Sequence, residues 1–402
     1  MQVYDYIIIG GGIVGLTLAD ALLKRAKGAR VLILEKEKEL GVHASGRNSG
    51  VLHAGLYYKP ETLKAKLCVE GARTMRAYCE ERRIPFKNLG KVIVPPLEED
   101  LSDGLETIIH NGTTNGVPVE MVDQKTLREL EPAISERVTK GVYSPSTSVV
   151  DPKAVLKKLQ EELLDSGVKI LCDSKVLRIS PKNKMVATYA DCFSYGHLIN
   201  AAGAYADVIA HKMGCGLDYQ MLPFKGLYYK LAKESGIEIR GNVYPVPDLR
   251  VPFLGVHFTR SVHGDVYVGP TAIPALGREH YHGVSGISLE DGFMITSSLA
   301  SQYLKNNNGF RRLVRQELPK LSKQGFFKCA QRLLPALKQE HLLPSAKVGI
   351  RAQLYHKKKA KLEMDFLVEK GEESTHVLNA VSPAFTCSFS FARHMTETYI
   401  PA

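Results

Sequence analysis

Cysteine is scarce in this 402-residue sequence, and the seven cysteines form no CxxC pair. Their number is odd and their positions are scattered, which indicates reduced thiols in a cytosolic protein, most of them packed as small hydrophobic side chains. No group of histidines and cysteines has the spacing of a zinc site, so we expect no metal.

Long apolar runs are absent as well. No stretch of about 18 consecutive apolar residues occurs, which is the least that a membrane-spanning helix needs. The N-terminus has no basic region before its first apolar run, and residues 1–5 leave no room for an organelle transit sequence. We therefore expect a cytoplasmic protein without a signal peptide or a transmembrane helix.

Positive charge is plentiful but unevenly placed. The formal net charge is +11, and residues 305–343 contain nine lysines and arginines against two glutamates. One interpretation is a solvated basic helix face. The other is a peripheral membrane-binding surface for the inner, anionic face of a membrane. Such a surface would suit electron transfer to a quinone of the respiratory chain. No nucleic-acid-binding motif accompanies these cations, so we expect no nucleic-acid partner.

The first residues combine a buried-type strand, a glycine turn, a helix and a second strand. The turn has the spacing Gly10-x-Gly12-x-x-Gly15. Gly10 permits the tight turn, Gly12 lets a pyrophosphate approach the backbone, and Gly15 allows the helix to pack on the strand. Glu35 ends the second strand 20 residues after Gly15, where its carboxylate suits both ribose hydroxyls. The pattern predicts a dinucleotide site at a helix N-terminus. An ordinary glycine-rich turn is the alternative.

Three later segments offer further contacts to the same cofactor. The loop over residues 44–58 is rich in small and hydrogen-bonding residues, and Val176 is expected against an adenine ring. The apolar strand over 198–201 enters a small-residue turn that suits a second close approach of the backbone. The residues expected to contact the cofactor in these segments and the first turn are Gly10, Gly12, Ile13, Val14, Gly15, Glu35, Lys36, Ser45, Arg47, Asn48, Ser49, Gly50, Val176, Ala202 and Gly203.

The middle and the end of the chain follow other patterns. Residues 217–274 alternate apolar and polar side chains with glycine and proline between them, which is typical of antiparallel sheet. Residues 97–110 and 290–343 look largely helical, and residues 174–179 look like a strand. Asp151 is a predicted N-cap because Pro152 follows it. A helix of small and aromatic residues is expected to close the chain.

Several of these segments together resemble the D-amino-acid-oxidase-like superfamily of FAD enzymes. Within it, the chain looks like the L-2-hydroxyglutarate oxidases and dehydrogenases nearly end to end. The segments that carry the resemblance are Gly10–Gly15, Glu35, Asn200-Ala201-Ala202-Gly203, Arg47-Asn48-Ser49-Gly50-Val51-x-His53-Ala54-Gly55-x-Tyr57-Tyr58, Leu63-Lys64-Ala65-x-Leu67-Cys68, Pro252-Phe253-Leu254-Gly255-Val256-His257-x-Thr259-Arg260 and Asn379-Ala380-x-Ser382-Pro383-Ala384. Phe385 and the bulky stretch Cys387–Phe391 depart from the family's pattern, and residues 305–343 contain little that matches it.

The resemblance implies an α/β fold with two domains. The first is a Rossmann-like FAD-binding domain of the glutathione-reductase-like type, made of residues 1–80, 140–215 and 345–402. The second is an inserted antiparallel-β substrate domain, made of residues 81–139 and 216–344, which includes the basic segment 305–343. The implied cofactor is FAD.

The implied reaction is oxidation of L-2-hydroxyglutarate to 2-oxoglutarate, with electrons passed on to a quinone or oxygen. The C2 hydride goes to flavin N5 while a base takes the hydroxyl proton. His53 is the first candidate base because imidazole titrates near neutral pH; a plain flavin contact is its alternative role. His257 competes with it, on a strand of the inserted sheet. Lys225 is expected near flavin N5 or the substrate.

A dianionic substrate needs two carboxylate anchors. Arginine binds carboxylates bidentately and stays charged, which makes Arg351 and Arg260 candidates. Arg351 lies where related oxidases carry an arginine; a surface ion pair is its alternative role. Lys64 is a third candidate. The tyrosines expected to line the substrate pocket are Tyr57, Tyr58 and Tyr244.

The start of the last helix is expected to stabilise the reduced flavin. Backbone N–H groups at a helix N-terminus would stabilise negative charge on the flavin pyrimidine. Plain capping of the helix by Ser382 is the alternative. The residues expected at this place are Ser382, Pro383, Ala384 and Thr386.

Three other interpretations stay open. Another member of the superfamily would oxidise an amino acid or glycerol 3-phosphate. A non-catalytic flavoprotein would bind FAD and attach to a membrane or partner through its basic segment. A nicotinamide dehydrogenase would be colourless when purified.

Overall fold

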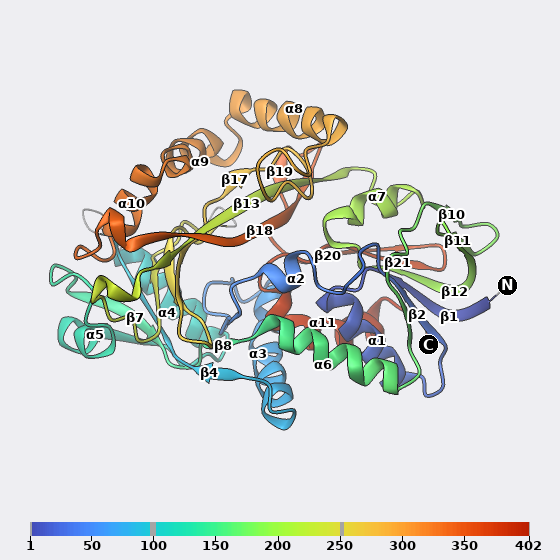
Figure 1. The fold of residues 1–402 in the computed structure, drawn as a ribbon, viewed down its shortest axis with the longest axis horizontal. Helices are drawn as coiled ribbons and strands as arrows, with labels where there is room; N and C mark the ends of the chain where they lie inside the picture. Colours follow the sequence, from blue (N-terminus) through green and yellow to red (C-terminus); the bar gives the residue numbers. More distant parts are fainter. Residues whose placement is uncertain (1, 97–101, 250–252, 402) are drawn as a thin grey trace.

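The computed structural model describes residues 2–96, 102–249 and 253–401, which form two lobes that meet in a central region (Figure 1). Their strands form an eight-stranded, a ten-stranded and a small three-stranded sheet. Both ends of the chain lie at the outer end of the lobe that holds the eight-stranded sheet (Figure 1). The α/β class predicted from the sequence is confirmed.

The eight-stranded sheet contains the strand with which the chain opens. β1 (Gln2–Ile9) pairs in parallel with β2 (Val31–Leu34) on one side and β12 (Cys192–Asn200) on the other. Ile7 and Ile8 are fully buried in two different clusters, as expected for a parallel strand covered on both faces. The other strands are β9 (Lys169–Leu171), β10 (Arg178–Ser180), β11 (Met185–Ala187), β20 (Leu367–Gly371) and β21 (Ser374–Asn379).

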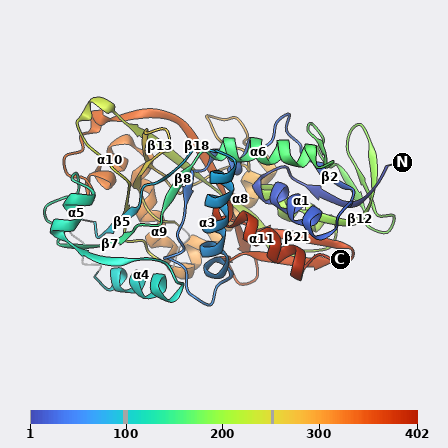
Figure 2. The same ribbon diagram turned by 90° about the horizontal axis from the view of Figure 1, so that it is seen from below.

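Helices cover one face of this sheet and lie side by side (Figure 2). They are α1 (Ile13–Arg25), α3 (Leu63–Glu81), α6 (Pro152–Asp165) and α11 (Ala384–Thr398). The opposite face carries the short α7 (Ala206–His211). Asp151 caps α6 as predicted, because its carboxylate accepts hydrogen bonds from the N–H groups of Lys153 and Ala154. The predicted closing helix is confirmed as α11.

The ten-stranded sheet is built around two long strands. β13 (Tyr219–Leu231) and β18 (Leu342–His356) pair antiparallel along nearly their full length and run between the lobes (Figure 1). The pairs formed within residues 217–274 are antiparallel, which confirms the pattern predicted there. The other strands are β5 (Lys91–Val94), β6 (Glu120–Asp123), β7 (Lys140–Ser144), β14 (Asn242–Pro245), β15 (His257–Arg260), β16 (Val266–Gly269), β17 (Ile273–Pro274) and β19 (Lys361–Leu362).

Five further helices belong to the second lobe. They are α4 (Ser102–Thr114), α5 (Gln124–Leu130), α8 (Leu289–Lys305), α9 (Phe310–Glu317) and α10 (Lys323–Gln331). The helix predicted over 97–110 is found as α4, and residues 97–101 lie outside the described residues. The helical prediction for 290–343 holds for α8 to α10 but is wrong from Leu342, where β18 begins. The small sheet and the remaining short helix are β3 (Val51–Leu52), β4 (Phe86–Asn88), β8 (Ser148–Val150) and α2 (Ala44–Arg47).

Other predicted boundaries differ from the strands observed. The strand predicted over 174–179 is wrong for residues 174–177, since β10 begins only at Arg178. The predicted boundary at residue 140 places β7 in the FAD-binding domain, although β7 pairs within the ten-stranded sheet. The boundary at residue 345 divides β18. We propose that the domain division follows the sheets at these two places.

The close packing of α3 against α11 can be tested by substituting a glycine at their contact. A Cβ atom on Gly71 would lie 2.6 Å from Cys387 Cα and 2.8 Å from the Thr386 carbonyl oxygen. Gly71→Ala should therefore destabilise the FAD-loaded protein by about 1–3 kcal/mol, the usual cost of overpacking. Gly292→Ala in α8 is the control, because its nearest atom would be at 3.5 Å. A thermal midpoint that falls equally in both variants contradicts this account of the packing.

Candidate active site

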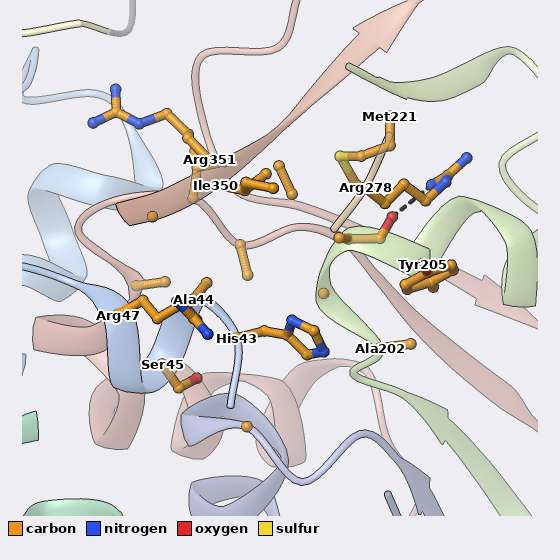
Figure 3. Close-up of a pocket in the computed structure, with 18 of the residues that line it drawn as sticks. His43, Ala44, Ser45, Arg47, Ala202, Tyr205, Met221, Arg278, Ile350 and Arg351 are labelled. Atoms are coloured by element: carbon orange, nitrogen blue, oxygen red, sulfur yellow. Dashed lines mark hydrogen bonds between the residues drawn. The ribbon is translucent and has the colours of Figure 1, made fainter. Parts of the chain in front are cut away.

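A large cavity of about 1320 Å³ lies where the parallel strands of the first lobe end and the second lobe begins. Residues at the ends of β1, β2 and β12 form one wall, and residues of β13 and β18 form another. Ligands of open α/β sheets bind at such strand ends. Figure 3 shows part of this lining, with Ser45 and Arg47 facing Ile350 across the cavity.

The glycine turn forms one end of the cavity. A Cβ atom on Gly10 would collide with the Ala201 carbonyl oxygen, and one on Gly12 would lie 2.9 Å from Ser45 Oγ. Ser45 Oγ accepts a hydrogen bond of 3.0 Å from the N–H of Ile13, at the start of α1. No acidic side chain occupies the first turn of α1. The positive end of this helix is thus left for a phosphate.

Glu35 presents its carboxylate at the end of β2. Its two oxygens accept hydrogen bonds from the N–H groups of Gly11, at 2.8 Å, and Glu37, at 3.0 Å. These contacts fix the side chain, and each oxygen keeps a lone pair for a ribose hydroxyl. Val176 lines the same end of the cavity.

Most of the residues predicted to contact the cofactor line this cavity. Gly15 and Gly50 do not: a Cβ on Gly15 would collide with the Gly10 carbonyl, and Gly50 lies beside the Val150 carbonyl with φ +79°. Both are packing and turn positions. Those that line the cavity are Gly10, Gly12, Ile13, Val14, Glu35, Lys36, Ser45, Arg47, Asn48, Ser49, Val176, Ala202, Gly203, Ser382, Pro383, Ala384 and Thr386.

A loop of the second lobe lies over this end of the cavity, and no sequence pattern predicted this contact. Tyr281 stacks on His43, with ring centroids 5.9 Å apart, and the Arg47 guanidinium lies 4.2 Å from the Tyr281 ring centroid. Glu279 forms an ion pair with Lys36. The one signal that could have pointed to His43 is its position between Glu35 and Ser45 in the sequence.

Glu37, His43 and Glu279 lie close enough together to hold a metal ion. The Lys36 ammonium contacts both of these carboxylates and offsets part of their negative charge. Lys36 itself, predicted to contact the cofactor, lines the cavity with its charge engaged in this way.

The residues at this end fit FAD. The glycine turn leads into a helix N-terminus, a carboxylate stands at the end of the neighbouring strand, and the small residues at 201–203 lie beside the turn. Such a cradle suits an ADP group, and the cavity continues from it between the two lobes. The glycine turn, Glu35 and Ala202 would hold the dinucleotide.

His53 lies at the other end of the cavity. Its backbone N–H donates a hydrogen bond of 3.1 Å to Thr386 Oγ1, which ties it to the start of α11. Its Nδ1 atom has no hydrogen-bond partner among the described residues. Burial, and then the charges of Lys91, His257 and Arg351, hold the pKa of His53 well below its usual value.

His257 also lines the cavity, and its orientation is fixed. Its Nδ1–H donates a hydrogen bond of 2.8 Å to the Gly255 carbonyl, so Nε2 carries the lone pair. Its ring stacks on Tyr244, with centroids 3.8 Å apart. Burial lowers the pKa of His257 to about 3, so the ring is neutral. Tyr244 lines the cavity as predicted.

Lys91 is buried next to Tyr244, and the sequence analysis did not identify it as a site residue. It is only 1% exposed, and its Nζ has no hydrogen-bond partner among the described residues. The ammonium lies 4.3 Å from the ring centroid of Tyr244 and 5.0 Å from that of Tyr57. Burial lowers the pKa of Lys91 to about 7. In the sequence it looks like the solvated first residue of a strand.

The predicted carboxylate anchors are separated by the fold. Arg351 lines the cavity and extends away from His43 and Tyr205 (Figure 3). Arg260 does not line it, and its guanidinium donates a hydrogen bond of 3.2 Å to the Ile239 carbonyl. Its predicted role in substrate binding has no support in this geometry. Lys64, Tyr57 and Tyr58 line a second, smaller cavity that Arg351 shares.

Lys225 is also outside the large cavity, although its neighbours Phe224 and Gly226 line it. Its Nζ lies 3.4 Å from His280 Nε2. Side chains alternate along a strand, so the residue between two lining positions points away. The predicted contact of Lys225 with flavin N5 or the substrate therefore has no support.

The start of α11 lines the cavity as predicted. Its N-cap is Pro383, and no side chain caps it, so plain capping by Ser382 is wrong. Phe385, which departs from the family's pattern, also lines the cavity. The N-terminal end of this helix is directed at the same space as His53.

Comparisons with known proteins agree with this site. The model of the FAD dependent oxidoreductase family matches residues 5–398. The chain is 36% identical to an L-2-hydroxyglutarate dehydrogenase of Indibacter alkaliphilus, over 98% of each protein. It is 34% identical to the human mitochondrial L-2-hydroxyglutarate dehydrogenase, over 97% of this chain and 87% of the human protein.

Solved structures share the fold. The L-alpha-glycerophosphate oxidase of Mycoplasma pneumoniae, solved with FAD bound, superposes with a TM-score of 0.76 at 22% identity, over 99% of this chain and 94% of that one. The glycine oxidase of Geobacillus kaustophilus superposes with a TM-score of 0.74 at 18% identity, over 100% and 96%. Together with the cradle for a dinucleotide, the family match shows that the chain belongs to the FAD-dependent oxidoreductases and uses FAD as its cofactor.

Proposed function

We propose that this enzyme oxidises L-2-hydroxyglutarate to 2-oxoglutarate. The observation that carries the proposal is the composition of the cavity beyond the cofactor cradle, where His53, His257 and Arg351 meet the start of α11. An α-hydroxy acid has a hydroxyl proton, which an imidazole can accept, and a carboxylate, which the guanidinium can bind. The two histidines and the arginine together therefore suit such a substrate. The names of the relatives, at 34% to 36% identity over nearly the whole chain, supply the substrate.

FAD supplies the acceptor for the hydride on C2 of the substrate. The residues of this chain do the rest. Arg351 binds a substrate carboxylate, because a guanidinium pairs with a carboxylate and stays charged. His53 takes the hydroxyl proton, since no described residue forms a hydrogen bond with its Nδ1 and the atom is available to accept a proton. His257, held by Gly255 and Tyr244, orients the hydroxyl through Nε2.

His53 is the residue to change first. His53→Gln should keep FAD bound and slow anaerobic flavin reduction by L-2-hydroxyglutarate at least about a hundredfold, the usual contribution of a general base. His257→Gln is the matched variant, and it should slow reduction less. Stopped-flow absorbance of the flavin measures both. If His53→Gln slows reduction mildly and His257→Gln slows it severely, His257 is the base and His53 orients the hydroxyl.

The pH dependence of reduction offers a second test. Burial and the charges of Lys91, His257 and Arg351 lower the pKa of His53, and a lowered pKa keeps the imidazole neutral in more acidic solution. The base is active when neutral, so the rate is retained below the usual histidine pKa of about 6.5. The second-order rate constant of flavin reduction should therefore start to fall only in solutions more acidic than the usual histidine pKa. A loss centred above pH 7 contradicts the assignment.

The substrate itself decides between this proposal and its rivals. Anaerobic bleaching of the flavin by L-2-hydroxyglutarate supports it. Bleaching only by an amino acid or glycerol 3-phosphate indicates another activity of the same family. A flavin that no hydroxy or amino acid reduces indicates a non-catalytic flavoprotein.

We also propose that the second lobe docks on an anionic membrane, where a quinone takes the electrons. Leu289, Phe293 and Leu304 on α8 are 92%, 79% and 73% exposed. Arg311 donates hydrogen bonds to the carbonyls at the end of α8, and it stands exposed beside Leu304. An exposed apolar helix face bordered by cations suits the interface of an anionic leaflet. No helix of the described residues is long and apolar enough to cross the bilayer.

This surface agrees only in part with the one expected from the sequence, since Leu304, Leu318 and Leu321 are exposed but other apolar side chains of the segment are not. Within 305–343, Phe310, Leu313, Phe326, Leu333 and Leu334 are buried in the lobe. These side chains are core residues and are not available to lipid. The exposed apolar face lies on α8, immediately before the basic segment.

Vesicle binding tests the surface. Phe293→Ser should lower binding to vesicles of phosphatidylcholine with phosphatidylglycerol by about tenfold, because a large apolar side chain no longer enters the interface. Tyr189→Ser is the control, since Tyr189 is 81% exposed on the other lobe. Co-sedimentation measures both. Equal binding to purely zwitterionic vesicles, or an equal loss in both variants, contradicts the proposal.

A further inference from the structure

A second cavity, of about 90 Å³, adjoins the large one. Arg351, Leu254, Val381 and Ser382 line both, so the two cavities are neighbours separated by these side chains. The small cavity has room for a few water molecules, or for a carboxylate on a short carbon chain. Its position beside Arg351 makes it an extension of the space for the substrate.

The lining of the small cavity includes a buried lysine, Lys64. It lies in the first turn of α3 and is 6% exposed. No described residue forms a hydrogen bond or an ion pair with its ammonium, which lies 5.9 Å from the Phe366 ring centroid. A buried cation without an anionic partner costs free energy, and a bound anion would remove that cost.

The nearby carboxylate of Asp365 does not fill this role. Its oxygens accept hydrogen bonds from the backbone N–H groups of Leu63, at 2.7 Å, and of Lys64, at 2.9 Å. A further bond of 2.8 Å comes from the N–H of Phe366. The carboxylate thus holds the start of α3 in place, and it leaves the lysine head group without a hydrogen bond.

Other polar atoms of the lining also lack partners among the described residues. Tyr57 Oη and Gln353 Oε1 are buried without a hydrogen bond. A tyrosine hydroxyl and a lysine ammonium both donate, so together they suit an acceptor with several lone pairs. The described lining contains one acidic residue, Asp248, and two basic residues, Lys64 and Arg351.

We propose that the small cavity binds the distal carboxylate of a dicarboxylate substrate, with Lys64 as the residue that selects for it. The C1 carboxylate and C2 then lie in the large cavity with His53 and His257, and Arg351 stands between the two. This inference rests on the proposed oxidation of a 2-hydroxy acid and names the feature of the substrate that the site selects. Substrates of equal length without the second carboxylate leave the ammonium unpaired.

Binding without turnover tests this subsite in the FAD-loaded enzyme. Glutarate carries both carboxylates but no hydroxyl, and pentanoate has the same chain length with one carboxylate. Isothermal titration calorimetry at pH 7 should show tighter binding of glutarate to the wild type. Lys64→Met should weaken glutarate about 10- to 100-fold, as expected for loss of a buried charged hydrogen bond, and should change pentanoate less than about threefold.

The control removes a different buried ammonium. Lys347 lies 4.3 Å from the ring centroid of Tyr267, and it lines neither cavity. Lys347→Met makes the same chemical change and should leave glutarate binding unaltered. Should Lys64→Met fail to fold, Tyr57→Phe removes only a hydroxyl from the same lining, and it should weaken glutarate but not pentanoate.

The pH dependence gives an independent readout. Burial, offset in part by Asp365, lowers the pKa of Lys64 to about 8, and Arg351 lowers it further while Cys387 and Cys68 oppose it. The ammonium is charged below that pKa, so glutarate affinity should fall as the pH rises through 8. Lys64→Met should abolish this fall. Asp248 lines the cavity as well.

The outcomes separate this proposal from the oxidation itself. Equal weakening of glutarate and pentanoate by Lys64→Met, or no weakening of either, overturns the subsite. A flavin that L-2-hydroxyglutarate never reduces overturns the proposed reaction, whereas glutarate binding that depends on Lys64 still supports the subsite.

Discussion

The structure depends on the close approach of two strand ends, those of β1 and β12. Their parallel pairing brings Gly10 against the Ala201 carbonyl, at a distance that leaves no space for a side chain. The same turn begins α1 and directs its N-terminus into the cavity. Every part of the cofactor cradle follows from this one constraint, because the carboxylate of Glu35 and the small residues at 201–203 are placed by strands paired to β1.

At the other end of the cavity, near His53 and His257, the notable feature is buried positive charge and not close packing. Lys64 and Lys91 are buried there, Arg351 is half-buried, and the two imidazoles beside them have lowered pKa values and are neutral. Burying an ammonium group without an anionic partner is unfavourable. A negatively charged ligand would offset this cost at Lys64 and Lys91.

Sequence reasoning succeeded where a local pattern determines structure. The glycine spacing, the cap at Asp151 and the alternation of residues 217–274 are local, and they were found where expected. It was less informative where the outcome depends on packing between distant segments. Arg260 was expected to bind a carboxylate and Lys225 to contact flavin N5 or the substrate, but neither lines the large cavity. The Arg260 guanidinium bonds a backbone carbonyl, and Lys225 lies beside His280. Lys91 and Tyr281 have roles that only the meeting of the two lobes creates.

The loop that carries Glu279 and Tyr281 covers the adenosine end of the cavity from the second lobe. Its partners Lys36, His43 and Arg47 belong to the first lobe. All five of these side chains also line the cavity, so both lobes contribute to the wall around the dinucleotide. Retention of the cofactor at this end is therefore linked to how firmly the two halves of the chain hold together.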